Sequence, residues 1–475
     1  MRDRYDLIVV GTGFASTFFL YQYLKKASPE VKVLVLERGY PYPYRDRRKF
    51  LAGTQAPVTK NPEPHQTYNN KNPEKHWAFS VGFGGSSNCW YACTPRFLPS
   101  DFKMKTLYGV GEDWPIDYDI LEPYYTASEE LMGISGPDET PFPKSGPYPL
   151  PAHQFTSVDR LMKNEYGILY ISQPTARASR AANGRNACCG NAVCGVCPVN
   201  AKFTIENSNL RVYDDSRVEI IYGAQVINLD LAASIARKVN FVRNGKEASV
   251  AGDVIALGAN AIFNASILLT SGDQHPLTGK GIGEQHGLDV IAYLDNLENV
   301  GGSTWVTANG YMLYDGDHRK TAAACLMESN NAPYVRLESN KWRHLAMFRM
   351  IFDDIPQHEN YVSVGERGIP EVHFHGHSDY TARGIERMKE KLPDLLRCLP
   401  VEKLEYLPPF KTEAHILGTT RMSSDPKAGV VDNKMIHHRY RNLFVLGSGS
   451  FTTFSPSNPT LTLSALSLMA ADLSF

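Results

Sequence analysis

The sequence has no long hydrophobic segment, no excess of charge of one sign and too few cysteines for a disulfide scaffold. No segment approaches the ~20 uninterrupted apolar residues of a membrane helix, so no membrane span is predicted. Lys and Arg number 49 and Asp and Glu number 50, giving a formal net charge of −1. This balance provides no general field for attracting nucleic acid or an anionic membrane. Eight cysteines in 475 residues exclude a disulfide-rich fold.

What remains is the composition of an ordinary folded protein. Hydrophobic residues make up 43% and charged residues 21% of the chain, which excludes disordered, collagenous and coiled-coil classes. The length allows two or three domains. The apolar run at residues 7–10 is too short for a secretion signal, and no small-residue cleavage pattern follows it. We therefore expect a cytoplasmic protein.

The first 37 residues predict a nucleotide-binding βαβ unit. A buried strand at 5–10 (YDLIVV) precedes Gly11 and Gly13, a helix follows over 17–26, and a second strand at 31–36 ends on Glu37. Gly11 permits a tight turn, Gly13 lets the backbone approach a pyrophosphate, and Glu37 would bind ribose hydroxyls. Ser16, itself small, stands where a third Gly or Ala is usual. The alternative is ordinary α/β packing without a nucleotide.

Later segments indicate where the chain returns to this unit. The glycine-rich segment 81–90 suits backbone lying flat against a planar ligand, although an ordinary turn would also explain it. Residues 41–76 have no sustained periodicity and predict a long surface excursion. We expect paired strands at 218–224 and 226–231, strand–turn–helix units at 254–269 and 442–472, and a second domain centred on residues 291–409.

Six segments, in the family's order, resemble the glucose–methanol–choline (GMC) family of FAD oxidoreductases, and the match spans nearly the whole chain. They are GTGFAS with Glu37, and residues 83–102, 113–136, 256–272, 415–422 and 442–466. The resemblance is nearest to bacterial sugar and polyol oxidoreductases, including pyranose oxidases and FAD glucose dehydrogenases. It implies an α/β fold with a Rossmann-type FAD-binding domain built from discontinuous segments (1–130, 190–295 and 410–475). A sheet-based α+β substrate domain would comprise 131–189 and 296–409.

The resemblance also implies a catalytic pair, His415 in HILGTTRM and Asn458 before the last helix. His415 would be the base that removes the hydroxyl proton while hydride passes to flavin N5, and Asn458 would hydrogen-bond the alcohol oxygen. His437 and His438 lie in a polar stretch and are expected at the surface. The FAD contacts that we predict are Gly11, Gly13, Phe14, Ala15, Glu37, Gly84, Gly85, Ser86, Asn88, Cys89, Gly258, Ser448, Asn458 and Thr460.

The activity implied is oxidation of a hydroxyl on a sugar, polyol or aminoglycoside-like metabolite, with oxygen or another electron acceptor reoxidising the flavin. In pyranose oxidases a His in the segment matching 84–90 carries the flavin covalently, whereas this chain has Cys89 there. We therefore expect noncovalent FAD. Alternatives on the same scaffold are a lyase, in which FAD does not turn over, and a non-redox flavoprotein that binds a partner.

Four cysteines lie within ten residues, at positions 188, 189, 194 and 197. Thiolates at such spacing suit iron or zinc, and FAD glucose dehydrogenases carry a similar segment that ligates an iron–sulfur cluster. The interval from Cys194 to Cys197 is one residue shorter than expected of that group, and residues 197–204 resemble family members without a cluster. An iron–sulfur site at Cys188, Cys194 and Cys197, a structural turn with reduced thiols, and a zinc site therefore all remain open.

Overall fold

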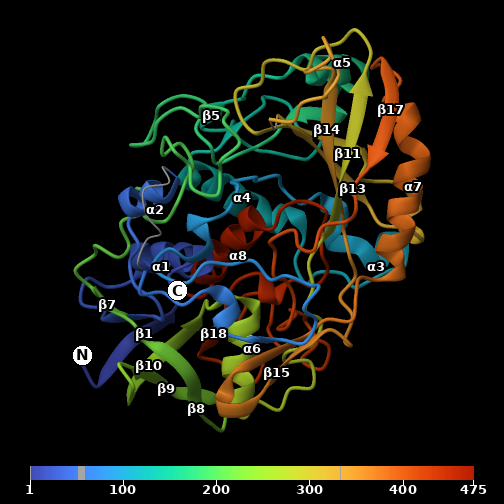
Figure 1. Ribbon diagram of the computed structural model, residues 1–475. Coiled ribbons are helices and arrows are strands. Elements are labelled where there is room, and N and C mark those ends of the chain that lie inside the picture. Colours follow the sequence, from blue (N-terminus) through green and yellow to red (C-terminus); the bar gives the residue numbers. More distant parts are fainter. Residues whose placement is uncertain (1, 52–58, 332) are drawn as a thin grey trace.

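The computed structural model describes residues 2–51, 59–331 and 333–475, and it contains two main sheets (Figure 1). The first sheet has a parallel core whose central strand, β1, is buried from residue 7 to residue 10, as the apolar run there predicts. Its parallel strands, in spatial order, are β7 (Val218–Tyr222), β2 (Val33–Glu37), β1 (Arg4–Val10), β10 (Lys246–Leu257) and β18 (Leu443–Val445).

Helices cover this sheet and give it one continuous hydrophobic core. Helix α1 (Phe14–Lys26) packs against α8 (Thr460–Asp472), which in turn contacts α4 (Tyr118–Met132). Helix α6 (Asn260–Thr270) follows β10 directly, so a strand–turn–helix unit forms there as predicted. The first and last segments of the chain are therefore packed together in one domain, and the predicted Rossmann-type α/β architecture is confirmed (Figure 1).

The expectation that residues 218–224 pair with 226–231 is wrong. Strand β7 pairs with β2, whereas β8 (Gln225–Ala232) pairs with β9 (Ile235–Arg243), which leads antiparallel into β10. The turn between β7 and β8 is redirected at Gly223, whose φ is +71° and whose N–H donates to the Gly39 carbonyl. The chain therefore leaves the parallel sheet at this point instead of folding back on β7.

The second main sheet is the predicted substrate-side sheet. Helices α5 (Ser157–Tyr166) and α7 (Asp379–Leu395) lie beside it, and the sheet face that they cover forms a separate hydrophobic cluster with them (Figure 1). Its strands, in spatial order, are β17 (Val401–Tyr406), β11 (His286–Leu294), β14 (Leu345–Phe352), β13 (Cys325–Asn330), β12 (Val306–Leu313) and β6 (Tyr170–Ser172). Strand β11 was expected before the boundary at residue 295 but pairs here, because its hydrogen-bonding partners are β14 and β17.

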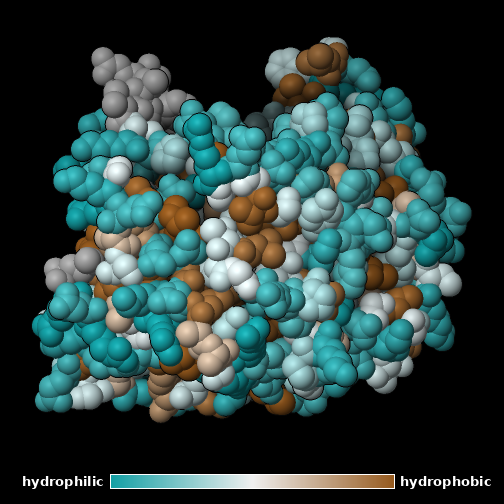
Figure 2. Space-filling model, turned by 90° about the horizontal axis from the view of Figure 1, so that it is seen from below, coloured by the Kyte–Doolittle hydropathy of each residue, from teal (hydrophilic) through white to brown (hydrophobic). Residues whose placement is uncertain are grey.

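Shorter elements connect the two sheets. The predicted excursion 41–76, of which residues 52–58 lie outside the described part, carries α2 and β3, and its last residues turn inward, so that Lys75 is buried. Among the described residues no helix is long and apolar enough to cross a membrane. The face drawn in Figure 2 is mostly hydrophilic, with apolar residues in small separate groups. The shorter helices and strands are α2 (Tyr44–Leu51), α3 (Met104–Tyr108), β3 (Asn69–Asn70), β4 (Ser135–Gly136), β5 (Leu150–Pro151), β15 (Tyr361–Val364) and β16 (Pro370–His373).

Candidate active site

A cavity of about 850 Å³ runs from the carboxyl end of the parallel sheet to the inner face of the second sheet. Its walls include the turn after β1, the end of β2, the glycine-rich segment at 82–93 and the start of α8. Strands β13 and β14 supply the opposite wall. Ligand sites in open parallel sheets lie at this carboxyl edge, so the cavity combines a nucleotide-type site with a chamber built by the second sheet.

The turn after β1 leaves room for a phosphate-bearing ligand. Gly11 has φ +91°, and a Cβ there would lie 2.7 Å from the Gly258 carbonyl oxygen. A Cβ at Gly13, by contrast, would meet no heavy atom within 4 Å. Ser16 fills the space where a Cβ on Gly258 would stand, which explains how a serine replaces the usual third small residue. The turn is thus closed toward the protein and open toward the cavity.

Glu37 ends β2 and lines the cavity, with only 5% of its surface exposed. Its carboxylate accepts hydrogen bonds from Thr12 Oγ1 (2.7 Å) and from the Gly39 amide (2.8 Å). These two bonds fix the orientation of the carboxylate, and each oxygen keeps a second lone pair for a ribose hydroxyl. Glu37 therefore presents free acceptor positions toward the cavity at the place where the sequence predicts a ribose.

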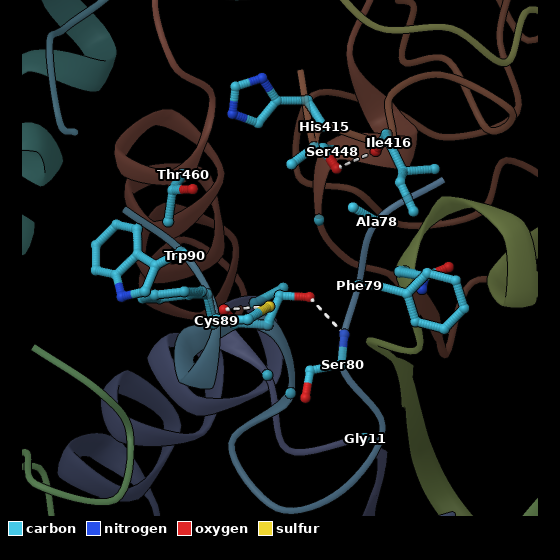
Figure 3. Close-up of a pocket in the computed structure, with 18 of the residues that line it drawn as sticks. Gly11, Ala78, Phe79, Ser80, Cys89, Trp90, His415, Ile416, Ser448 and Thr460 are labelled. Atoms are coloured by element: carbon cyan, nitrogen blue, oxygen red, sulfur yellow. Dashed lines mark hydrogen bonds between the residues drawn. The ribbon is translucent and has the colours of Figure 1, made fainter. Parts of the chain in front are cut away.

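Most of the predicted site residues meet at this cavity. Two of them, Gly84 and Asn88, do not line the cavity and lie behind its wall. There the Gly84 amide donates to Thr12 Oγ1, and the Asn88 side chain donates to the Phe83 carbonyl. Figure 3 shows Cys89, Trp90, Thr460 and His415 around the same open space. The predicted residues that line the cavity are Gly11, Gly13, Phe14, Ala15, Glu37, Gly85, Ser86, Cys89, Gly258, His415, Ser448, Asn458 and Thr460.

His415 projects into the cavity with one ring nitrogen fixed by Gln285 (Figure 3 shows the ring). Gln285 Nε2 donates to the carbonyls of Ser455 (2.8 Å) and Ser457 (2.9 Å), so its Oε1 must face His415 Nδ1 at 2.9 Å. An amide oxygen only accepts, and therefore Nδ1 carries the proton and Nε2 keeps a free lone pair. Burial, with a smaller contribution from Lys75, lowers the pKa of His415 to about 3. The imidazole is neutral at pH 7 and able to accept a proton at Nε2.

The same glutamine connects His415 to Asn458. Residues 455–457, held by Gln285, lead directly into Asn458, which lines the cavity and precedes the helix α8. The Oδ1 atom of Asn458 is buried without a hydrogen-bond partner among the described residues. A buried amide oxygen without a hydrogen bond lowers the stability of the folded protein unless a ligand donates to it. The arrangement brings together a base and a polar side chain able to bind one substrate oxygen.

A buried ion pair holds the segment that carries His415. The Glu284 carboxylate accepts from the amides of Glu413 (3.2 Å) and His415 (3.3 Å) and forms an ion pair with Lys75. Both side chains are almost fully buried. Gln285, Glu284 and Lys75 were not singled out in the sequence, because their roles depend on contacts with segments more than 100 residues away.

The second sheet adds charged residues that the sequence analysis also missed. Glu328 and Asn330 on β13, Arg349 on β14 and the buried Glu413 line the cavity. Glu328 and Asn330 are two residues apart and therefore point to the same face of the strand. A glutamate directly after the apolar run ACLM (324–327) was the available signal.

His437 is buried rather than exposed, so the expectation for this residue is wrong. Its side chain is 1% exposed and lies 3.4 Å from the buried Asp273 carboxylate. This partner, 164 positions away, makes burial of an imidazole in a locally polar segment acceptable. His438 is half-buried and bonds to the Ser423 carbonyl.

The cysteine segment gives no support to a metal site. Within residues 2–51, 59–331 and 333–475, no group of three or more metal-ligating side chains is placed to hold a metal ion. Cys188 contacts Thr304 Oγ1 (3.5 Å), and Cys197 Sγ accepts from the Ala201 amide (3.2 Å). The buried Lys202 donates to carbonyls of Asn88, Trp90 and Gly195, which ties the segment to the glycine-rich wall. These contacts correspond to the structural-turn alternative.

Comparison with known proteins identifies a family domain in the last part of the chain. A family model described as GMC oxidoreductase matches residues 400–467, the part that contains His415 and Asn458. The chain is also 26% identical to the fructose dehydrogenase large subunit of Gluconobacter japonicus, with 98% of this chain and 97% of that protein covered. The chain contains a GMC oxidoreductase domain.

Further likenesses span the chain from end to end. It is 22% identical to paromamine 6'-oxidase of Streptomyces fradiae, covering 99% of this chain and 91% of that protein. Pyridoxine 4-oxidase from Mesorbium loti has the same fold, with a TM-score of 0.67 at 17% identity and 99% coverage of both chains. GMC oxidoreductases are FAD enzymes, so the predicted class of fold, cofactor and reaction is confirmed.

Proposed function

We propose that this enzyme oxidises a hydroxyl group of a sugar-like or polyol metabolite, with His415 as the base. The observation that carries the proposal is the Gln285 bond, which leaves His415 Nε2 unprotonated in a cavity whose other end fits a dinucleotide. The relatives are named for fructose and paromamine, both rich in hydroxyl groups. Several polar side chains on the second sheet provide hydrogen-bonding partners for such a molecule.

Each residue of the site has a separate role in one two-electron oxidation. FAD, when bound, supplies the acceptor for the hydride that leaves the carbinol carbon. His415 Nε2 takes the hydroxyl proton as the carbon–oxygen double bond forms, so the alcohol loses one hydride and one proton in total. Asn458 would donate a hydrogen bond from Nδ2 to the same oxygen and so orient the carbinol hydrogen. Gly11, Gly13 and Glu37 would hold the pyrophosphate and ribose.

We further propose that FAD is bound noncovalently. Cys89 lines the cavity, but desolvation raises the pKa of its thiol, which disfavours the reactive thiolate. The Sγ atom also contacts the Ser86 carbonyl (3.6 Å; Figure 3).

The test of the proposed function is anaerobic mixing of the yellow holoenzyme with a panel of sugars, polyols and amino sugars. The proposal predicts loss of flavin absorbance with a subset of them and a carbonyl product in equal amount. A compound that is converted without bleaching the flavin would favour a lyase instead. Protein that contains no FAD and does not take it up would contradict the proposal.

A further inference from the structure

The chamber wall opposite the nucleotide-type site holds more carboxylates than cations. Arg349 donates to both oxygens of Asp289 (3.0 and 3.4 Å), and its other terminal nitrogen lies 3.8 Å from Glu413. Glu328 stands directly across from Arg349 in the β13–β14 register but accepts no hydrogen bond from it. A single guanidinium group therefore serves three buried carboxylates.

A second buried cation is kept away from Glu328 by a neutral spacer. Gln173 donates to Glu328 Oε1 (2.9 Å) while its own carbonyl accepts from Arg177 (2.9 Å). Arg177 is otherwise bound to Thr304 and to main-chain carbonyls. Lys75 is paired with Glu284 and contributes no spare charge. If all these groups were ionised, Asp289, Glu328 and Glu413 would exceed Arg349 and Arg177 by one negative charge.

Polar atoms without partners point to a ligand in the same place. The Oε1 atom of Glu413 and the Nδ2 atom of Asn330 are buried and make no hydrogen bond to any described residue. The side chain of Glu413 is 4% exposed and Asn330 is 6% exposed, and both line the cavity. Trp305 Nε1, on the same wall, is also unpaired. A ligand here must supply a donor to the carboxylates and acceptors to Asn330 and Trp305.

Burial raises the pKa of Glu328 and of Glu413 to about 7, because the nearby guanidinium groups do not fully offset the cost of two buried charges. Either a proton or a ligand cation can therefore supply the missing positive charge. An ammonium group has three donors and no acceptor, which matches a pair of carboxylates. Hydroxyl oxygens match the free N–H groups of Asn330 and Trp305.

We propose that the substrate is an amine-bearing polyol, such as an amino sugar or an amino alditol, whose ammonium group is bound by Glu328 and Glu413. This inference rests on the proposed function, since it concerns the molecule whose hydroxyl is presented to His415. Glu328 and Glu413 are specificity residues in this account.

The test compares matched compounds in anaerobic stopped-flow reduction of the FAD-loaded parent enzyme at pH 7. D-Glucosamine is set against D-glucose and N-acetyl-D-glucosamine, D-galactosamine against D-galactose, and 1-amino-1-deoxysorbitol against sorbitol. In at least one set the free amine should exceed its neutral counterparts by ~10-fold or more in the ratio of reduction rate to apparent Kd, because only the amine makes a charge-assisted bond.

Two variants assign the preference to the carboxylates. Glu328→Gln and Glu413→Gln should each lower the preference for the amine over its neutral counterpart by ~10-fold or more. Glu386→Gln, on the exposed face of α7 with 69% of the side chain accessible, is the matched control and should keep the parent preference.

Equal reduction by amine and neutral members in the parent would overturn the inference while leaving the proposed function intact. An unchanged preference for the amine in FAD-loaded Glu328→Gln and Glu413→Gln would overturn the inference as well. If no compound bleaches the flavin, the proposed function fails, and the inference with it. Should both variants fail to retain FAD, the comparison of matched compounds in the parent decides.

Discussion

A histidine acts as a base only through a ring nitrogen that carries no proton. At His415 the side-chain amide of Gln285 determines which of the two nitrogens that is. Gln285 uses its two N–H groups on the carbonyls of Ser455 and Ser457, so only its oxygen can face the ring. Gln285 is a positioning residue, because it acts through His415 rather than on the substrate.

Replacing Gln285 with Leu should slow flavin reduction by ~10–10² while changing the apparent Kd for substrate much less, since tautomer and ring orientation are lost but the binding wall is kept. Gln285→Glu restores an acceptor for Nδ1–H and should recover part of the rate. The measurement is anaerobic stopped-flow absorbance at saturating substrate, with FAD content as the control. Parent rates in Gln285→Leu would show that the imidazole is oriented by other contacts.

Cys89 gives a second test at this scale. Because desolvation raises the pKa of its thiol, which disfavours the reactive thiolate, and Sγ contacts the Ser86 carbonyl, acid precipitation of the holoenzyme should release the flavin into the supernatant. Flavin that stays in the pellet of the parent, and is released from Cys89→Ser, would contradict noncovalent binding.

His415 was predictable from the motif around it, whereas Gln285 was not. The two residues are 130 positions apart, and only the pairing of β11 into the second sheet brings Gln285 beneath the ring. Glu37 was predictable because its place depends on a local strand–helix–strand unit. His437 was wrongly placed at the surface because its partner, Asp273, lies 164 positions away in sequence.

At the scale of elements, residues 412–415 form a segment whose position is fixed by hydrogen bonds to the buried Glu284. Glu284 binds two of its amides and the Thr412 hydroxyl (3.0 Å), and Lys75 neutralises the carboxylate. The excursion at 41–76, unremarkable in sequence, thus carries near its end a cation that stabilises the segment leading to His415.

Lys75→Met and Glu284→Gln should each destabilise the FAD-loaded enzyme by about 3–5 kcal/mol, because each leaves a buried group without its partner. The double variant should lose less unfolding free energy than the sum of the losses in the two single variants. Urea unfolding followed by tryptophan fluorescence measures these values, with Lys389→Met on exposed α7 as the control. Single-variant losses below about 0.5 kcal/mol would contradict a supporting role for the pair.

The strand–helix units were predicted within a few residues, since their periodicity is local: the first helix was expected at 17–26, and α1 spans Phe14–Lys26. The pairing of β7 and β8 was predicted wrongly, because two adjacent strand-like segments do not reveal that a turn at Gly223 separates them. Strand partners depend on contacts between distant segments, which periodicity does not encode.

At the scale of the whole molecule, the chain passes repeatedly between the two sheets, and the cavity exists only where they meet. His415 and Asn458 come from the last third of the chain, the nucleotide-type turn from the first residues, and the chamber wall from β13 and β14. The resemblance predicted this division, but the carboxylates of the chamber became visible only in the structure.

The central claim is that His415 removes the hydroxyl proton during flavin reduction. The most direct measurement is anaerobic stopped-flow reduction of parent and His415→Ala enzymes, both loaded with FAD, by the most active compound of the panel. The account predicts that His415→Ala retains FAD and slows reduction by ~10²–10⁴, with Asn458→Ala showing a smaller loss. Reduction of the His415→Ala flavin at the parent rate would contradict the account.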